Sequence, residues 1–492
     1  MVPSNPKKIK ILLVTAVWGE WHRDVFLNVN LPTLLAPGNI PFLGTNCDIK
    51  YRIFTRSADL KKLKDSQSLK ALSRFMELQF ELIPEEKLSQ PIAAHQWAWE
   101  QATQYSKNVG SYILFIPPDV AWSEGSFGHL GRLLSSGKKA VFMTYMRVVA
   151  DTFIPALMAK KNVEENVICV DGREMVSLAL THIHPLMAAY SYKSSYFPGH
   201  SEMVLWPVRK EGVLLRVLAR EMFLYDPRSI GVTNQMLMDG NFSSKDVVFV
   251  DDSDNLFGVS LTPLGKDVSW HMQYRKLNPL NIARWWLDYD SPSNDFIANV
   301  PVRWHTGICK QANWCRMEIR SARFIKNAVA AREGLRVWRE LMALGCTLAA
   351  SLVAIPIGFG FLRKAFPPFT AAIIFAPTDE AFKSFSDYEI QELVDCKNQK
   401  KLMTIFQHHG VFQQENRHSG LNDSLKEINF QKSFITVAGD EIKLEKSERG
   451  FFVNDFEIIG NPKKIGPFYI CKIDGVLGSA NRVNSLASIH ST

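Results

Sequence analysis

The sequence is poor in cysteine and has none of the cysteine spacings that mark a zinc site or a disulfide framework. Its seven cysteines are scattered through 492 residues. The closest two, Cys309 and Cys315, have no second pair beside them to complete a zinc site. An odd number of widely separated cysteines does not suggest a disulfide framework either. We therefore expect reduced thiols in a reducing compartment.

A glycine-rich phosphate loop of the GxxxxGKS or GxGxxG type is also missing. In kinases, ATPases and dinucleotide oxidoreductases, such a loop brings backbone amides against the phosphates, so its absence argues against these classes. Long apolar runs are scarce as well. Residues 9–17 form a run too short for a convincing signal peptide, and only residues 341–362 form an uncharged stretch long enough to span a bilayer.

Charge of one sign is not in large excess, because 57 Lys and Arg residues face 49 Asp and Glu residues, for a net charge of +8. With 46% hydrophobic and 22% charged residues, the chain has a globular composition, which excludes a disordered, collagen-like or multi-span membrane protein. Most of the surplus lies in residues 316–339. We expect a solvated helix face there, or contact with an anionic membrane surface or partner, and no nucleic-acid partner.

Strand and helix patterns alternate in the first half of the chain. Short apolar runs at 11–14, 51–55, 112–116 and 141–143 predict strands, and apolar residues at helical spacing predict a helix over 91–106. Strands separated by helices indicate an α/β fold with a mostly parallel sheet covered by helices. Ligands of such sheets bind outside the carboxyl ends of the strands. These ends open into loops at 16–19, 55–57, 118–119, 145–147 and 251–254.

The order of these parts resembles a GT-A-fold glycosyltransferase. The resemblance covers residues 9–310 and is carried by the helix with Ala93-Ala94-His95, the strand 112–116, Asp119, and the later segments 181–186 and 250–254. It implies a nucleotide-sugar donor and a glycan or surface-polymer acceptor. The donor-binding residues that it suggests are Trp18, Glu20, Arg23, Thr55 and Asp119.

Two readings of these donor residues remain open. Trp18 could stack on a base and Arg23 could bind a diphosphate, or the loop that holds them could be an aromatic lid packed on the sheet. Asp119 follows two prolines, so it could equally be a turn residue. No pair of residues stands out as a catalytic base and nucleophile, so the catalytic residues stay unknown.

The acidic motif of this family usually has two carboxylates one residue apart, which together reach a divalent cation. The expected place offers only Asp119, whereas Asp252 and Asp254 have the required spacing after the apolar strand 247–250. We predict these two as ligands of Mn²⁺ or Mg²⁺, with a solvated turn as the alternative.

Two histidines, His182 and His184, flank Ile183. On a strand they would share one face and could contact a phosphate or an acceptor hydroxyl. A pair of packed, hydrogen-bonded histidines is the alternative.

The end of the chain resembles a fasciclin domain, an α/β (α+β) module of adhesion and matrix proteins. The strings FAPTDEAF at 375–382 and IDGVL at 473–477 stand about ninety residues apart, with His408 and His409 on a helix between them. The resemblance implies a protein partner and no catalysis. The two histidines are expected to make buried polar contacts that support the fold.

We therefore predict a transferase-like domain (1–315), a basic linker with an apolar helical segment (316–368), a fasciclin core (369–480) and a tail (481–492). The chain would be a glycosyltransferase with a fasciclin module for protein or matrix contact. The alternative is a non-catalytic adhesion or scaffold protein with a degenerate transferase fold. The expected location is cytoplasmic or membrane-associated. If 341–362 is a helix that spans the membrane, the fasciclin module would be exported.

Overall fold

The computed structural model divides the chain into two compact units. The first comprises Met1–Leu277 and Tyr289–Ile325, and the second comprises Asn278–Asp288 and Lys326–Thr492. The six cysteines that the structure describes are all free. The described residues are 8–198, 202–218, 221–229, 231–234, 237–239, 245–264, 272–273, 277–288, 297–354, 372–394, 399–412, 433–465 and 468–478.

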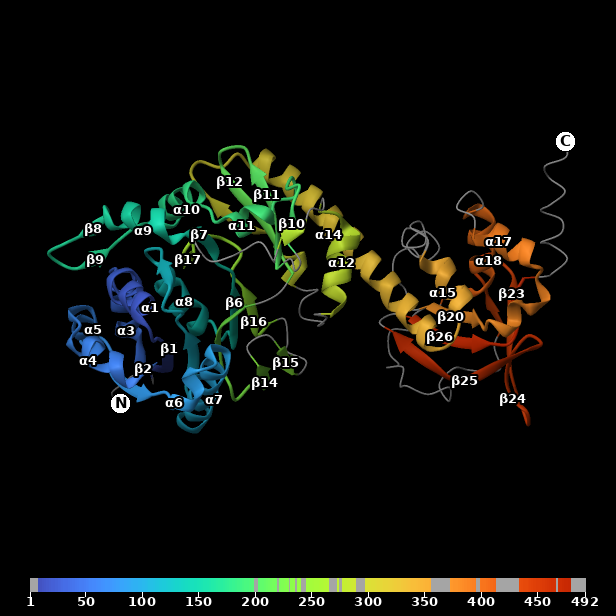
Figure 1. Cartoon of the computed structure of the whole chain (residues 1–492), viewed down its shortest axis with the longest axis horizontal. Helices are drawn as coiled ribbons and strands as arrows, with labels where there is room; N and C mark the ends of the chain where they lie inside the picture. Colours follow the sequence, from blue (N-terminus) through green and yellow to red (C-terminus); the bar gives the residue numbers. More distant parts are fainter. Residues whose placement is uncertain are drawn as a thin grey trace, which may run out of the picture. The chain divides into compact units, whose positions relative to one another are not determined.

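The first unit is built on a seven-stranded sheet with the order β16-β6-β13-β4-β1-β2-β3. Figure 1 labels β1, β2, β6 and β16 of this sheet. Only β13 is antiparallel to its neighbours, so the predicted mostly parallel sheet with flanking helices is confirmed. The strands are β1 (Ile9–Ala16), β2 (Cys47–Thr55), β3 (Glu77–Leu82), β4 (Tyr112–Phe115), β6 (Ala140–Met143), β13 (Glu221–Tyr225) and β16 (Val247–Phe249).

The sheet is apolar on both faces because each face carries a hydrophobic core. Leu12 and Val14 of β1 belong to one core, and Ile11 and Leu13 belong to the other. A strand that is covered on both faces reads as a continuous apolar run, as β1 does. Helix α7 (Pro91–Val109) contributes small buried alanines to the first core and ends at Gly110, which has φ 69°.

Short helices and smaller sheets complete this unit. The helices are α1 (Glu20–Val25), the π-helix η1 (Phe26–Asn30), α2 (Leu31–Leu34), α3 (Ile40–Asn46), α4 (Ser57–Asp65), α5 (Gln67–Leu72), α6 (Glu85–Leu88), α8 (Ser126–Ser135), α9 (Ala150–Met158), α10 (Gly172–Thr181) and α11 (Pro185–Ala189). One three-stranded sheet has the order β5 (Val120–Trp122), β17 (Gly258–Thr262), β7 (Met146–Val149), and another has the order β11 (Met203–Val208), β12 (Gly212–Val217), β19 (Val302–His305). Three two-stranded sheets pair β8 (Lys161–Asn162) with β9 (Val167–Ile168), β10 (Phe197–Pro198) with β18 (Met272–Gln273), and β14 (Gly231–Asn234) with β15 (Leu237–Asp239).

Helix α14 (Gln311–Ala343) is followed by a break and then by α15 (Thr347–Ala354). Gly345 lies in the break with φ 74° and ends the first helix. A single spanning helix over 341–362 is therefore not supported, although residues 355–362 lie outside the described part of the chain. Among the residues that the structure describes, no helix combines the length and the apolar character needed to cross a membrane.

The second unit contains another seven-stranded sheet, with the order β21-β20-β26-β25-β24-β23-β22. Its first core joins Val337 of α14 and Ala350 of α15 to Ile374 and Ile470 of the sheet. The strands are β20 (Ala372–Pro377), β21 (Gly410–Phe412), β22 (Ser433–Ile435), β23 (Glu441–Ser447), β24 (Gly450–Val453), β25 (Phe456–Ile465) and β26 (Phe468–Ile473). The remaining helices are α12 (Pro279–Asp288), the 3₁₀ helix η3 (Glu380–Ser384), α17 (Asp387–Val394) and α18 (Gln399–His408).

The basic segment 316–339 is not one solvated face. Arg332 is fully buried, lies 4.5 Å from the Trp286 ring centroid and is paired with Glu333. Stacking on an aromatic ring and an ion pair compensate for burying this charge. The exposed cations are Arg316, Arg320, Arg323, Lys326 and Arg339. Contact with an anionic membrane surface stays a prediction, and it no longer includes Arg332.

Candidate metal-binding site

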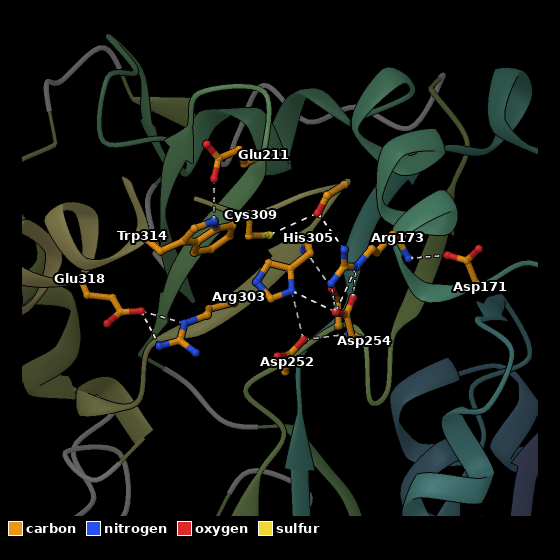
Figure 2. Close-up of polar contacts among 12 residues, drawn as sticks. Asp171, Arg173, Glu211, Asp252, Asp254, Arg303, His305, Cys309, Trp314 and Glu318 are labelled. Carbon is orange, nitrogen blue, oxygen red and sulfur yellow. Dashed lines mark hydrogen bonds and ion pairs between the residues drawn. The ribbon is translucent and has the colours of Figure 1, made fainter. Parts of the chain in front are cut away.

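The Asp252–Asp254 loop begins shortly after β16, at the carboxyl end of a parallel strand. Its backbone is attached to β19, because Ser253 N donates to Arg303 O at 2.9 Å and Arg303 N donates to Asp251 O at 2.8 Å. The Ser253 hydroxyl also accepts a hydrogen bond from His305 N at 2.9 Å. These bonds bring His305, 51 positions further along the chain, beside the two carboxylates (Figure 2).

Three potential metal ligands converge at this loop. His305 Nδ1 lies 3.2 Å from Asp252 Oδ1 and 3.5 Å from Asp254 Oδ2. One ligand atom from each residue falls within 4.8 Å of the others. The His305 side chain is 9% exposed, and its Nδ1 is buried without a hydrogen-bond partner of good geometry. A buried nitrogen that faces two carboxylates is suited to a divalent cation. Carboxylates suit both Mn²⁺ and Mg²⁺, but an imidazole ligand suits a transition metal, so this set of ligands favours Mn²⁺ over Mg²⁺.

The electrostatic environment keeps Asp252 ionised. Burial alone would raise its pKa, but the contact with His305, the hydrogen bond from Asp254 N and the charge of Arg303 together lower it. The Asp254 amide donates to Asp252 Oδ1 at 2.9 Å. Since a lowered pKa means a carboxylate at neutral pH, Asp252 is in the form that binds a cation.

The imidazole of His305 is packed against Trp314 at the start of α14. The two rings meet edge to face, with centroids 4.6 Å apart and planes at 78°. Glu211 fixes the indole, because Trp314 Nε1 donates to Glu211 Oε2 at 3.1 Å. The same carboxylate accepts from Lys310 N at 2.7 Å and from Asn313 Nδ2 at 2.6 Å. The hydrogen bond from Lys310 N is the main cause of the lowered pKa of Glu211.

Arg173 contacts the site from the first turn of α10. Its Nη2 lies 2.7 Å from Asp254 Oδ2, and its Nη1 donates to Gly307 O at 3.0 Å (Figure 2). The Asp171 side chain caps this helix by accepting from Arg173 N and Glu174 N. Asp254 is therefore shared between His305 and a guanidinium.

The structure places the predicted donor residues at other strand ends of the same sheet. Trp18 follows β1 and packs on His95, with ring centroids 4.8 Å apart, and Glu20 is exposed in α1. Thr55 is fully buried at the end of β2, and Asp119 follows β4, half-buried. At about 4.8 Å per strand, three spacings put the ends of β4 and β16 about 14 Å apart. The predicted donor residues and the Asp252–Asp254 loop therefore follow different strands of the sheet.

The guanidinium of Arg23 is already engaged within the protein. Its side chain is 6% exposed, its Nη1 lies 2.7 Å from Asp59 Oδ1, and its Nη2 lies 2.8 Å from Asp24 Oδ1. Binding a diphosphate would require these ion pairs to open, so this role stays a prediction.

The two predicted histidines lie outside the named strands, and their contact with a phosphate or an acceptor hydroxyl stays a prediction. His182 ends α10 and His184 precedes α11, with an isolated bridge at Ile183 between them. His182 Nδ1 lies 2.9 Å from Thr152 Oγ1, whereas His184 is fully buried. The length of α10 separates His182 from Arg173 by about 14 Å, so the pair lies away from the acidic loop.

Sequence reasoning identified Asp252 and Asp254 but missed His305 and Arg173. The two carboxylates have a local spacing signal, and the other two residues have none. His305 ends a short strand that could be recognised, but its pairing with the acidic loop depends on long-range contacts.

Comparison with known proteins identifies one domain. Residues 363–479 match the family model of the fasciclin domain, so the chain contains such a domain there. No curated protein matches this chain.

Two solved structures resemble parts of the chain. The apo form of mouse xyloside xylosyltransferase 1 is 10% identical, covers 31% of this chain and 59% of its own, and has a TM-score of 0.20. A putative glucose-1-phosphate thymidylyltransferase from Bacillus anthracis, in complex with a sucrose, is 12% identical, covers 29% and 57%, and has a TM-score of 0.17. The chain spans less than two thirds of either protein, and at these TM-scores neither bears on its function.

Proposed function

We propose that the first unit is a metal-dependent glycosyltransferase. It would transfer a sugar from a nucleotide-sugar donor to a glycan or surface-polymer acceptor. The observation that supports this proposal is the buried Nδ1 of His305, which lies 3.2 Å from Asp252 Oδ1 and 3.5 Å from Asp254 Oδ2 at the carboxyl end of a parallel strand. Ligand sites of α/β sheets lie at this edge.

Asp252, Asp254 and His305 would hold the cation. When bound, a divalent cation supplies positive charge that binds a diphosphate and stabilises the charge on the leaving group. The protein keeps Asp252 ionised and holds His305 through the Ser253 hydroxyl and the edge of Trp314. Trp18, Glu20, Thr55 and Asp119 lie along the same sheet edge and remain the proposed donor contacts. Arg23 also remains one, provided that its ion pairs open.

The fasciclin domain suggests contact with other proteins or with a matrix. In this proposal it holds the transferase unit at the surface where its acceptor is found. Its sheet and helices offer no cluster of metal-ligating groups among the described residues.

A second candidate is a non-catalytic adhesion or scaffold protein with a degenerate transferase fold. Two ion pairs favour it, because Arg173 occupies Asp254 and Arg23 occupies Asp59. Charges that are satisfied within the protein need no ligand. The single carboxylate at Asp119 points the same way.

Isothermal titration calorimetry with a panel of nucleotide sugars, with and without Mn²⁺, separates the two candidates. The transferase predicts that at least one donor binds only when Mn²⁺ is present, and that Asp252→Asn abolishes this binding. Asp48→Asn is the matched control, because Asp48 is an exposed acid in β2. If the folded wild-type protein binds no donor in either condition, the enzyme proposal is wrong.

A further inference from the structure

Arg173 and the proposed cation would use the same carboxylate. The guanidinium makes three contacts with Asp254: Nε lies 3.1 Å from each carboxylate oxygen and Nη2 lies 2.7 Å from Oδ2. Oδ2 is also the oxygen that faces His305 Nδ1 at 3.5 Å. A positive charge of the protein therefore already lies where a divalent ion would bind.

The position of Arg173 is fixed by its helix and not by Asp254 alone. The Asp171 side chain accepts from Arg173 N at 2.9 Å. Gly172 packs directly on the acidic loop, since a Cβ at this position would lie 2.3 Å from Ser253 O. The Arg173 guanidinium itself has two partners, because its Nη1 donates to Gly307 O in addition to the contacts with Asp254.

We propose that Arg173 is a resident counter-cation, which competes with the divalent cation for Asp254 and so sets the affinity of the site. This inference rests on the proposed function. A cation bound to Asp254 would come within a few ångströms of the guanidinium, and like charges at this distance repel. The ion must therefore displace the guanidinium or bind against its charge.

The strength of the effect follows from the exposure of the pair. The side chains of Arg173 and Asp254 are 45% and 32% exposed, so water screens the repulsion. We expect removal of the charge to tighten Mn²⁺ binding about tenfold, well below the value for a dry site.

The test measures Mn²⁺ binding to the full chain by electron paramagnetic resonance, in which the signal of free Mn²⁺ falls as the ion binds. The probe is MnCl₂ alone. Arg173→Gln removes the charge, and Arg173→Lys keeps it. Lys160→Gln is the charge-matched control, because Lys160 pairs with Glu174 of the same helix at 2.5 Å and does not contact Asp254. Circular dichroism verifies that each variant is folded.

The inference predicts tighter binding by Arg173→Gln, with Arg173→Lys and Lys160→Gln close to the wild-type protein. Binding that is equal in the wild-type protein and in folded Arg173→Gln overturns the inference and leaves the proposed metal site intact. Binding by neither protein overturns both. Binding by Arg173→Gln alone supports the competition and contradicts metal dependence of the natural protein. Equal tightening by Lys160→Gln would show a general charge effect and would also overturn the inference.

Discussion

At the residue scale, the buried imidazole of His409 in the second unit makes two hydrogen bonds to backbone groups. Its Nε2 accepts from Leu477 N at 2.9 Å, so its proton is on Nδ1, which donates to Phe375 O at 2.8 Å. The imidazole therefore joins β20, the end of α18 and the IDGVL segment. Burial lowers the pKa of His409 to about 4.

This pKa makes the stability of the second unit depend on pH. Below the unfolded pKa of about 6.5, the unfolded chain binds a proton that the folded chain excludes, so stability falls as the pH falls from about 6.5 to about 4. The full loss from His409 is about 3 kcal/mol, and the contribution of this histidine no longer changes above this range. Scanning calorimetry at several pH values measures it. Asparagine does not titrate, so His409→Asn should remove the part of the pH dependence of stability that His409 contributes. An unchanged pH dependence in this variant would contradict the lowered pKa of His409.

A second residue-scale prediction concerns Asp59, the buried partner of Arg23. Its carboxylate, 1% exposed, accepts from Gly19 N at 2.9 Å and from Arg56 Nε at 2.6 Å. Asp59→Asn leaves the buried guanidinium of Arg23 with only the exposed Asp24 as its counter-ion and should cost about 3 kcal/mol of unfolding free energy. Urea denaturation measures this cost.

Asp24→Asn is the matched control because Asp24 pairs with the same arginine but is 51% exposed. It should cost less than about 1 kcal/mol. Equal losses of unfolding free energy in the two variants would contradict the prediction that the buried carboxylate of Asp59 contributes more than the exposed carboxylate of Asp24.

The sequence predicted individual residues when their signal was local. Asp252 and Asp254 were found by their spacing after an apolar strand. Arg23 was read as a free cation, because nothing local shows that Asp59, 36 positions away, pairs with it. His305 was missed for the same reason.

At the element scale, the close approach of α10 to the acidic loop depends on a missing side chain. Gly172→Ala would place a Cβ 2.3 Å from Ser253 O, so the helix or the loop must shift. We expect Mn²⁺ affinity to fall about tenfold, because the ligand atoms move apart by a few tenths of an ångström or more. Titration with Mn²⁺ measures the change.

Gly307→Ala is the control for this prediction. Gly307 also contacts Arg173 through its carbonyl, but a Cβ there meets no atom within 4 Å. Affinity should stay at the wild-type value. If Gly172→Ala also leaves it unchanged, the helix start does not position the loop.

Elements with a strong apolar period were predicted correctly. The strand runs at 11–14 and 112–116 and the helix 91–106 correspond to β1, β4 and α7. The sequence around His182 is typical of a strand, because polar and apolar residues alternate there. In the structure the alternation comes from a helix end and a helix start, each with its own capping geometry.

At the scale of the whole molecule, the fasciclin match and the folded second unit differ in extent. The match begins at residue 363, but Val337 and Leu341 of α14 and Ala350 of α15 lie in the same core as Ile374 and Phe468. Asp379 Oδ1 also accepts from Leu348 N at 2.9 Å, which joins α15 to the FAPTDEAF segment.

We therefore predict that a fragment of residues 278–492, which contains the whole second unit, folds cooperatively and that a fragment of residues 363–492 does not. The shorter fragment would expose the apolar side of β20 and β26, and a small domain has little stability to lose. Thermal unfolding followed by circular dichroism compares them. A cooperative transition with the same midpoint in both fragments would contradict the prediction.

For the chain as a whole, the sequence predicted the mixed α/β architecture and the presence of a fasciclin domain near its end. The resemblance to GT-A glycosyltransferases depends on the order of parts, which fixes no side-chain geometry. For that reason the proposed metal ligands could be predicted only as a pair, and the proposed third ligand required the register of β19 against the acidic loop.

The central claim is that Asp252, Asp254 and His305 bind a divalent cation together, and pulsed electron paramagnetic resonance of the protein with bound Mn²⁺ tests it most directly. Our account predicts nitrogen-14 modulation from a coordinated imidazole in the wild-type protein. In His305→Asn the modulation should vanish and the Mn²⁺ affinity should fall. Specific Mn²⁺ binding without nitrogen modulation, or modulation that persists in His305→Asn, would contradict it.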